Sequence, residues 1–128
     1  MDKGVKEDII EVSKVWGKEV WIVNNDKYCA KLLHINRGAE GSIHYHPIKQ
    51  ETFYCLEGQV ALTIEDTDYM LGQFSRPKTI LPGQKHQMKG ICDSVILEVS
   101  THHDDKDVVR LSESKPAPKD GWYNNARN

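Results

Sequence analysis

Short apolar runs alternate with clusters of Gly, Asn, Asp and Pro along most of the chain. The runs are rich in β-branched and aromatic residues, which favour strands over helices. We predict about eight strands from this pattern, over residues 19–23, 28–35, 41–46, 51–56, 59–64, 78–81, 86–89 and 94–100. Many short strands at regular spacing indicate an antiparallel sandwich or barrel, so the predicted fold class is all-β.

Turn-forming residues separate these runs, at 24–26, 36–38, 57–58, 65–68, 71–72, 82–83 and 89–90. Residues 6–14 fit either a turn or two of helix or an edge strand, and the pattern leaves both open. A chain of 128 residues fits a single domain. We divide it into an N-terminal segment (1–18), a β-barrel (19–111) and a polar, proline-broken tail (112–128).

Within that tail, Trp122 and Tyr123 stand out as large aromatic residues. Such side chains are seldom left fully in water, so they could dock on the barrel or on a second subunit. A loosely ordered terminus is the alternative.

Charge and composition exclude some classes of partner. Lys and Arg number 17 against 19 Asp and Glu, a net charge of -2, and no basic block could track a phosphate backbone. No apolar run approaches the ~20 residues of a membrane span, and the N-terminus lacks the apolar core of a secretory signal. We therefore expect a cytoplasmic protein without nucleic-acid or membrane partners, whose three cysteines are free thiols.

One motif carries the candidate chemistry, with Gly38, His44, His46, Glu51 and Gly58 in fixed spacing. Alternate residues of a strand point to the same face, so His44 and His46 both point inward. The chain then turns, and Glu51 opens the antiparallel neighbour with its carboxylate beside the two imidazoles. Three metal ligands would thus converge from one hairpin.

A fourth ligand would come from a later strand, where a Pro-Gly turn precedes His86. Three neutral imidazoles and a carboxylate suit one divalent transition metal (Mn, Fe, Co, Ni or Zn) better than calcium or magnesium. Two remaining coordination positions would make the site catalytic in form. Hydrogen-bonded core histidines are the alternative interpretation. We expect the 102–105 run of two His and two Asp to be a solvated loop.

Residues 38–58 resemble the first motif of the cupin superfamily, and residues 81–86 resemble the core of its second motif. This resemblance implies a double-stranded β-helix, the jelly-roll barrel of cupins. The second match departs from the family pattern, since Ser75 stands where glycine is common, Pro82 lies next to the usual proline position and Gly90 replaces a common asparagine.

A narrower resemblance covers residues 16–25, 28–32, 97–100 and 107–111, which are similar to the cupin domain of type II mannose-6-phosphate isomerases and related sugar-phosphate cupins. It implies a small sugar or sugar phosphate as the ligand and an aldose-ketose isomerisation as the reaction. A glutamine often occupies the position of His44 in those proteins, so the metal preference need not carry over.

For such an isomerisation, Glu98 is our candidate base. It lies on the strand 94–100, and a carboxylate in a mostly apolar barrel has its pKa raised toward the useful range. Lys31 is a second candidate catalytic residue, on a neighbouring strand. A structural ion pair between Glu98 and Lys31 is the alternative.

Lys31, Lys85, Arg76 and Arg110 could meet a phosphate or sugar hydroxyls, as could His34 if its strand faces the pocket. Two other functions remain open on the same ligands: an Fe(II) dioxygenase, and a non-catalytic sugar-binding or regulatory cupin. The alternate face of residues 52–56 is apolar enough to need cover, so we predict a homodimer.

Overall fold

The computed structural model describes residues 3–119, which form eleven strands and no helix. They are β1 (Ile10–Lys14), β2 (Gly17–Asn24), β3 (Cys29–Ile35), β4 (His44–Tyr45), β5 (Glu51–Glu57), β6 (Gln59–Ile64), β7 (Thr67–Gly72), β8 (Lys78–Ile80), β9 (His86–Gly90), β10 (Ser94–Ser100) and β11 (Val109–Arg110). Within this part of the chain, no helix is long and apolar enough to cross a membrane. Trp122 and Tyr123 lie outside the described residues.

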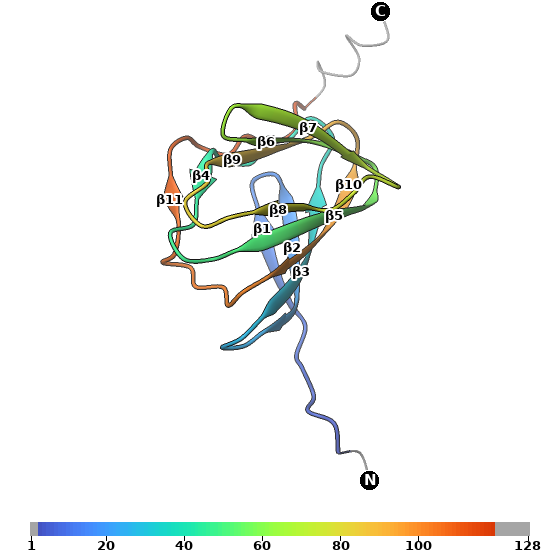
Figure 1. The fold of residues 1–128 in the computed structure, drawn as a ribbon. Coiled ribbons are helices and arrows are strands. Elements are labelled where there is room, and N and C mark those ends of the chain that lie inside the picture. Colours follow the sequence, from blue (N-terminus) through green and yellow to red (C-terminus); the bar gives the residue numbers. More distant parts are fainter. Residues whose placement is uncertain (1–2, 120–128) are drawn as a thin grey trace, which may run out of the picture.

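Two antiparallel sheets face each other and enclose the interior (Figure 1). The first has the strand order β1-β2-β3-β10-β5-β8, and the second has the order β11-β4-β9-β6-β7. Strands distant in sequence are therefore neighbours, with β10 between β3 and β5, and β9 between β4 and β6. This arrangement confirms the predicted all-β jelly-roll barrel.

Inward-facing positions of the larger sheet change from apolar to polar along the barrel. On β3 the buried residues run from Ile35 and Leu33 to Lys31, and on β10 they run from Ile96 to Glu98. Glu98 lies opposite Lys31 in the β-sheet register. One end of the barrel interior is therefore an apolar core, and the other end carries buried charges.

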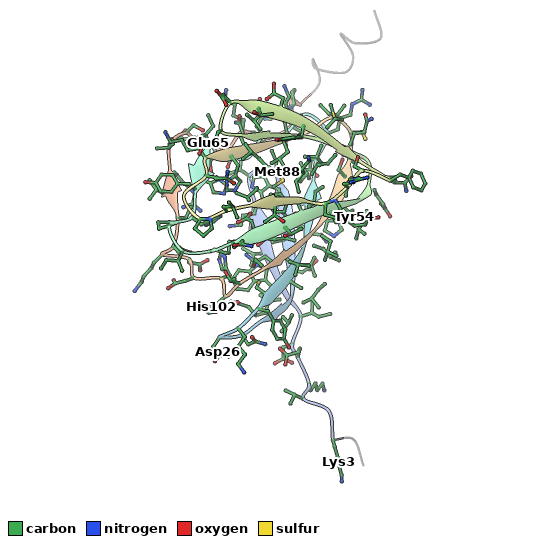
Figure 2. The ribbon with its side chains drawn as sticks, viewed as in Figure 1. Lys3, Asp26, Tyr54, Glu65, Met88 and His102 are labelled. Carbon is green, nitrogen blue, oxygen red and sulfur yellow. The ribbon has the colours of Figure 1, made fainter. Side chains whose placement is uncertain are left out.

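The apolar end holds a cluster of buried residues from both sheets, against which Trp16, Ile64 and Met88 pack. Figure 2 labels Met88 between the two sheets. Full burial of one such side chain contributes about 1.5–3 kcal/mol, so this cluster supplies the main stabilisation of the barrel. Its members are Leu33, Ile35, Phe53, Cys55, Val60, Leu62, Leu71, Ile80 and Ile96.

One strand decides between two open alternatives, and two others were not predicted. The N-terminal segment resolves to an edge strand, because Ile10–Lys14 pairs with β2. Residues 67–72 form β7 and pair with β6 throughout, so the turns predicted at 67–68 and 71–72 are strand instead. Only Glu65 and Asp66 make the turn, and Glu65 adopts a positive φ of 55°. The two-residue strand β11 was too short to predict from composition.

The glycine that closes the first motif is required by a close approach. Gly58 has a φ of 82°, and a Cβ placed there would lie 2.3 Å from Ser94 Oγ and 2.5 Å from the Asp93 carbonyl oxygen. Ser94 Oγ in turn accepts a hydrogen bond from the Gln59 main-chain N–H at 3.0 Å. Gly58 therefore lets the β5–β6 turn contact the start of β10.

All three cysteines are free thiols, as predicted. Cys29 and Cys55 are buried and Cys92 is half-buried. Burial raises the pKa of the Cys29 and Cys55 thiols, so both stay protonated at neutral pH.

Candidate metal centre and adjoining cavity

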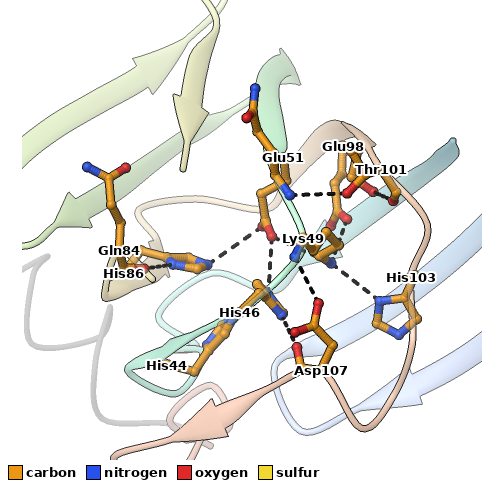
Figure 3. A network of polar contacts seen from close by, with 12 residues as sticks. His44, His46, Lys49, Glu51, Gln84, His86, Glu98, Thr101, His103 and Asp107 are labelled. Carbon is orange, nitrogen blue, oxygen red and sulfur yellow. Dashed lines mark hydrogen bonds and ion pairs between the residues drawn. The ribbon is translucent and has the colours of Figure 1, made fainter. Parts of the chain in front are cut away.

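Three histidines meet at the polar end of the barrel (Figure 3). His44 belongs to β4, His46 follows that strand, and His86 opens β9 as the direct register partner of His44. Their candidate ligand atoms all lie within 4.8 Å of one another. Three His residues of the described chain could thus hold one metal ion.

Main-chain carbonyls fix the tautomer of each ring. His44 Nδ1 lies 2.9 Å from the Ser42 carbonyl oxygen, His46 Nδ1 lies 2.7 Å from that of Asp107, and His86 Nδ1 lies 3.0 Å from that of Gln84. A carbonyl only accepts, so each Nδ1 carries the hydrogen and donates it. Each Nε2 of the neutral ring is then left with a lone pair, which is how protein scaffolds prepare imidazoles for metals.

Glu51 opens β5 and lies beside two of the three histidines. Its Oε2 lies 3.1 Å from His46 Nε2, and its Oε1 lies 3.6 Å from His86 Nε2. Glu51 Oε2 and His86 Nε2 are buried without a hydrogen-bond partner in the described chain. Leaving such buried atoms unsatisfied costs about 1–3 kcal/mol each. The donor set therefore fits a metal ion.

The charge states of these residues also fit a metal site. Burial and the neighbouring His86 lower the pKa of His44 to about 4, and burial lowers the pKa of His46 as well. Burial raises the pKa of Glu51, but its contact with His86 and the positive charge of Lys49 outweigh burial and lower it to about 2. At neutral pH, His44 and His46 are uncharged imidazoles and Glu51 is a carboxylate. Together with His86 they form a donor set that suits a divalent transition metal.

Lys49 joins the histidine cluster to Glu98, and sequence analysis had assigned it no role. Its Nζ donates a hydrogen bond to Glu98 Oε2 at 3.1 Å and lies 3.5 Å from Glu51 Oε2. Burial alone would lower the pKa of Lys49, but the Glu98 and Glu51 carboxylates outweigh burial and raise it. Burial and the negative charge of Glu51 raise the pKa of Glu98. No strand repeat gives its direction, because Lys49 lies in the turn between β4 and β5.

Asp107 secures the turn that carries Lys49. The Asp107 carboxylate accepts hydrogen bonds from the main-chain N–H groups of Ile48 and Lys49, both at 2.9 Å. Its main-chain carbonyl accepts the hydrogen bond from His46 described above. One residue of the segment after β10 thus positions both a candidate ligand and the buried lysine.

The alternative ion pair between Glu98 and Lys31 is not the one that forms. Glu98 pairs with Lys49, and Lys31 Nζ lies 3.5 Å from Glu19 Oε1. Lys31 Nζ also lies 4.4 Å from the ring centroid of Trp21, a cation–π contact. The register places Glu98 and Lys31 side by side, but each has a nearer partner of opposite charge.

A cavity of about 180 Å³ adjoins the histidine cluster. Its walls include the three histidines, Glu51, Lys49 and the predicted residues Lys31, Glu98 and Arg110. His103 also lines it and lies 3.3 Å from Lys49 Nζ through its Nδ1. The prediction of a solvated loop at 102–105 was therefore wrong for His103, because the loop folds back over the barrel opening.

The structure does not bring His34, Lys85 and Arg76 to this cavity, contrary to our prediction of substrate contacts. His34 faces outward from β3, since it alternates with the buried Leu33 and Ile35. Lys85 is exposed beside Glu65 at the β6–β7 turn, and Arg76 is exposed between β7 and β8. Strand periodicity excludes His34 from the cavity once the side chains of Leu33 and Ile35 are known to point inward.

No protein-family profile matches the chain, and no curated protein matches its sequence. Solved structures do match its fold. An RmlC-like cupin from Shewanella frigidimarina has a TM-score of 0.68 and 17% identity, over 77% of this chain and 86% of that chain. Pac13, a nucleoside dehydratase from Streptomyces, has a TM-score of 0.70 and 13% identity, over 88% of this chain and 92% of Pac13.

A third match is CapF from Staphylococcus aureus, a capsular polysaccharide assembling protein. Its TM-score is 0.66 at 13% identity, over 88% of this chain and 33% of CapF, so this chain spans about a third of that protein. Together these matches define the fold as a cupin-type jelly-roll barrel. Within that class the chain is similar to the RmlC-like cupins. The resemblance to mannose-6-phosphate isomerases rests on sequence motifs and stays a prediction.

Proposed function

We propose that this chain is a metal-dependent cupin that isomerises a small aldose or ketose, free or phosphorylated. The observation that carries the proposal is the juxtaposition of three carbonyl-anchored imidazoles with the buried Lys49–Glu98 pair in one cavity. Ligands and an acid-base pair are what such an isomerisation needs.

His44, His46, Glu51 and His86 would hold one divalent transition metal. When bound, it would supply Lewis acidity toward the oxygens at the reacting end of a sugar. The rest of the chemistry falls to side chains. As a carboxylate, Glu98 accepts a proton from the carbon next to the carbonyl and returns it to the former carbonyl carbon. The proton of the neighbouring hydroxyl passes to the former carbonyl oxygen, so a new carbonyl forms at the neighbouring carbon and Glu98 is unchanged after turnover. Lys49 orients Glu98 by hydrogen bonding and offsets its charge.

Two of the matched structures support a ligand that contains a sugar. Pac13 acts on a nucleoside and has been seen with uridine, and CapF assembles a capsular polysaccharide. Both therefore act on compounds that contain sugars. A sugar ligand for this chain agrees with those activities.

The test combines elemental analysis of the purified protein with a screen for isomerisation of free and phosphorylated sugars. We expect a bound transition metal, loss of turnover after chelation, and recovery on metal addition. Glu98→Gln should lower kcat on the order of 10²–10⁴-fold while the metal content is unchanged. Glu57→Gln, at the exposed end of β5, is the matched control and should retain activity.

Other outcomes would point to the alternative functions. Bound iron with substrate-dependent oxygen uptake would favour the dioxygenase. Ligand binding without turnover, unchanged in Glu98→Gln, would favour the non-catalytic sugar-binding cupin. A protein that takes up no transition metal would refute the proposal.

We also propose that the active form is a homodimer that pairs through the outer face of the larger sheet. An apolar row crosses four strands on that face, because the register aligns Val20 with Leu32, Leu32 with Leu97 and Leu97 with Tyr54. Figure 2 labels Tyr54 on the outer side of the barrel. A second copy of the chain would cover this row.

A further inference from the structure

The cavity beside the histidine cluster differs from a phosphate-binding site in its charge. It is lined by four basic and four acidic side chains, so their formal charges cancel. The basic residues are Lys14, Lys31, Lys49 and Arg110, and the acidic residues are Glu19, Glu51, Glu98 and Asp105. Burial lowers the pKa of His103, which therefore adds no charge at neutral pH.

Each buried cation of the wall already has a carboxylate partner. Lys31 is 1% exposed and lies 3.5 Å from Glu19, and Lys49 is 3% exposed and lies 3.1 Å from Glu98. A phosphate that entered this space would compete with these carboxylates and would leave one of them buried without its cation. That exchange is unfavourable, as for any buried charge that loses its partner.

The other two cations of the lining, Arg110 and Lys14, are solvated or already paired with a carboxylate. Arg110 is exposed on β11, and Lys14 lies 4.0 Å from Glu19. Neither provides a buried, unshared positive charge that could compensate the desolvation of a phosphate. Apart from the proposed metal, the side chains of the wall therefore lack the excess positive charge that phosphate recognition uses.

The same ion pairs suit hydroxyl groups. A sugar hydroxyl both donates and accepts, so it can donate to a carboxylate and accept from the neighbouring ammonium without separating them. Trp16, Phe53 and Met88 supply apolar wall on which the C–H groups of a sugar ring can pack. The lining therefore offers both hydrogen bonds and apolar contacts, and an uncharged polyol requires both for binding.

The volume points the same way. The cavity measures about 180 Å³, below the roughly 300–1,000 Å³ of pockets that take drug-sized ligands. A monosaccharide is smaller than such ligands, whereas a phosphate ester adds bulk and charge and a nucleotide-linked sugar is far larger.

We infer that the ligand of this cavity is a free, uncharged monosaccharide and not a sugar phosphate or a nucleotide-linked sugar. This inference rests on the proposed function and names the substrate class of the same site. It departs from the expectation that the sugar-phosphate cupins raised, because the buried lysines are already paired.

The experiment compares each aldohexose and aldopentose with its terminal phosphate ester on the metal-loaded protein, by turnover and by calorimetric binding. We expect kcat/KM and affinity to favour the free sugar on the order of tenfold or more. A preference for the phosphate ester that Arg110→Gln abolishes would overturn the inference and leave the proposed function intact. Turnover of neither would count against the proposed function, and the binding preference would still decide the inference.

A second arm uses inorganic phosphate and unfolding temperature, without any turnover. Wild-type protein should gain no thermal stability from phosphate, since Lys31 is occupied by Glu19. Glu19→Gln removes that carboxylate charge and should make the unfolding temperature rise with phosphate concentration. Equal stabilisation of the wild type by phosphate would contradict the inference, and this wild-type measurement remains decisive if the variant fails to fold.

Discussion

His46 donates a hydrogen bond from Nδ1 to the main-chain carbonyl of Asp107, at 2.7 Å and across 61 positions of sequence. The contact joins a candidate metal ligand on the motif strand to the segment that follows β10. The Asp107 carboxylate also accepts hydrogen bonds from two main-chain N–H groups of the turn that leads to Glu51. The candidate ligands from the first motif are thus oriented by a residue outside that motif.

Asp107→Ala should weaken metal binding, because the turn that carries Lys49 loses both hydrogen bonds from the carboxylate. Loss of such supporting contacts lowers metal affinity roughly 10–100-fold. Competition with a chromophoric chelator would measure the change. Asp66→Ala, at the tip of the β6–β7 hairpin, is the control and should bind as the wild type does. Equal affinities in all three proteins would show that the turn holds its shape without Asp107.

Lys49→Met should destabilise the metal-free protein by about 3–5 kcal/mol at neutral pH, since two buried carboxylates lose their shared cation. Urea unfolding would measure the free energy. The double variant Lys49→Met/Glu98→Gln should recover part of the loss, with a coupling energy of about 0.5–3 kcal/mol. Strictly additive effects would mean that the two side chains do not stabilise each other.

Glu19→Gln should lower stability in a pH-dependent way. Burial raises the pKa of Glu19, but Lys31, the Trp21 N–H and Lys14 together hold it below its ordinary value of 4.5. A depressed carboxyl pKa stabilises the fold above that ordinary value, and the contribution disappears as the pH falls through the folded-state pKa.

We therefore expect a difference from the wild type of about 1–3 kcal/mol at pH 7 that shrinks steadily below pH ~4.5. Denaturant unfolding across this range would measure it, with Glu11→Gln as the control in an exposed ion pair with Lys18. The control should change little at any pH. A difference for Glu19→Gln that stayed constant with pH would assign the effect to packing and not to charge.

Val99→Lys should dissociate the proposed homodimer. Val99 is 50% exposed and lies two residues along β10 from Leu97, on the same outer face, where a lysine in an interface would be buried without a partner. Size-exclusion chromatography with light scattering would measure the mass. Met70→Lys, 52% exposed on the other sheet, is the matched control and should stay dimeric. A wild-type protein of monomeric mass would refute the dimer.

Most strands could be predicted from the local amino-acid composition, but only some of the site residues could be predicted in this way. The spacing of His44, His46 and Glu51 predicted convergence, because strand periodicity and one turn fix their directions. The Pro-Gly turn before His86 predicts a fourth ligand from a later strand, although no local rule brings β9 beside β4. Strand β7 was missed because its Thr-Asp start and Leu-Gly end have the composition of turns, while its pairing with β6 is tertiary.

Four site assignments were missed or wrong because the sequence gives no side-chain direction at those positions. Lys49 and His103 lie in connecting segments, where side-chain direction depends on what the segment packs against and not on a repeat. Their roles arise from long-range contacts, with Glu98 for Lys49 and with Lys49 for His103. Arg76 and Lys85 were chosen by charge alone, and charge gives no direction.

The strand that carries His44 is only two residues long and is flanked by β11 on one side and β9 on the other. Its outer hydrogen-bonding partner is therefore translated more than sixty residues after it. During synthesis, a nascent chain that has already folded its larger sheet would still lack the Asp107 carbonyl that orients His46. Loading of the proposed metal would accordingly be one of the last events in maturation, after the ribosome has released residues 107–110.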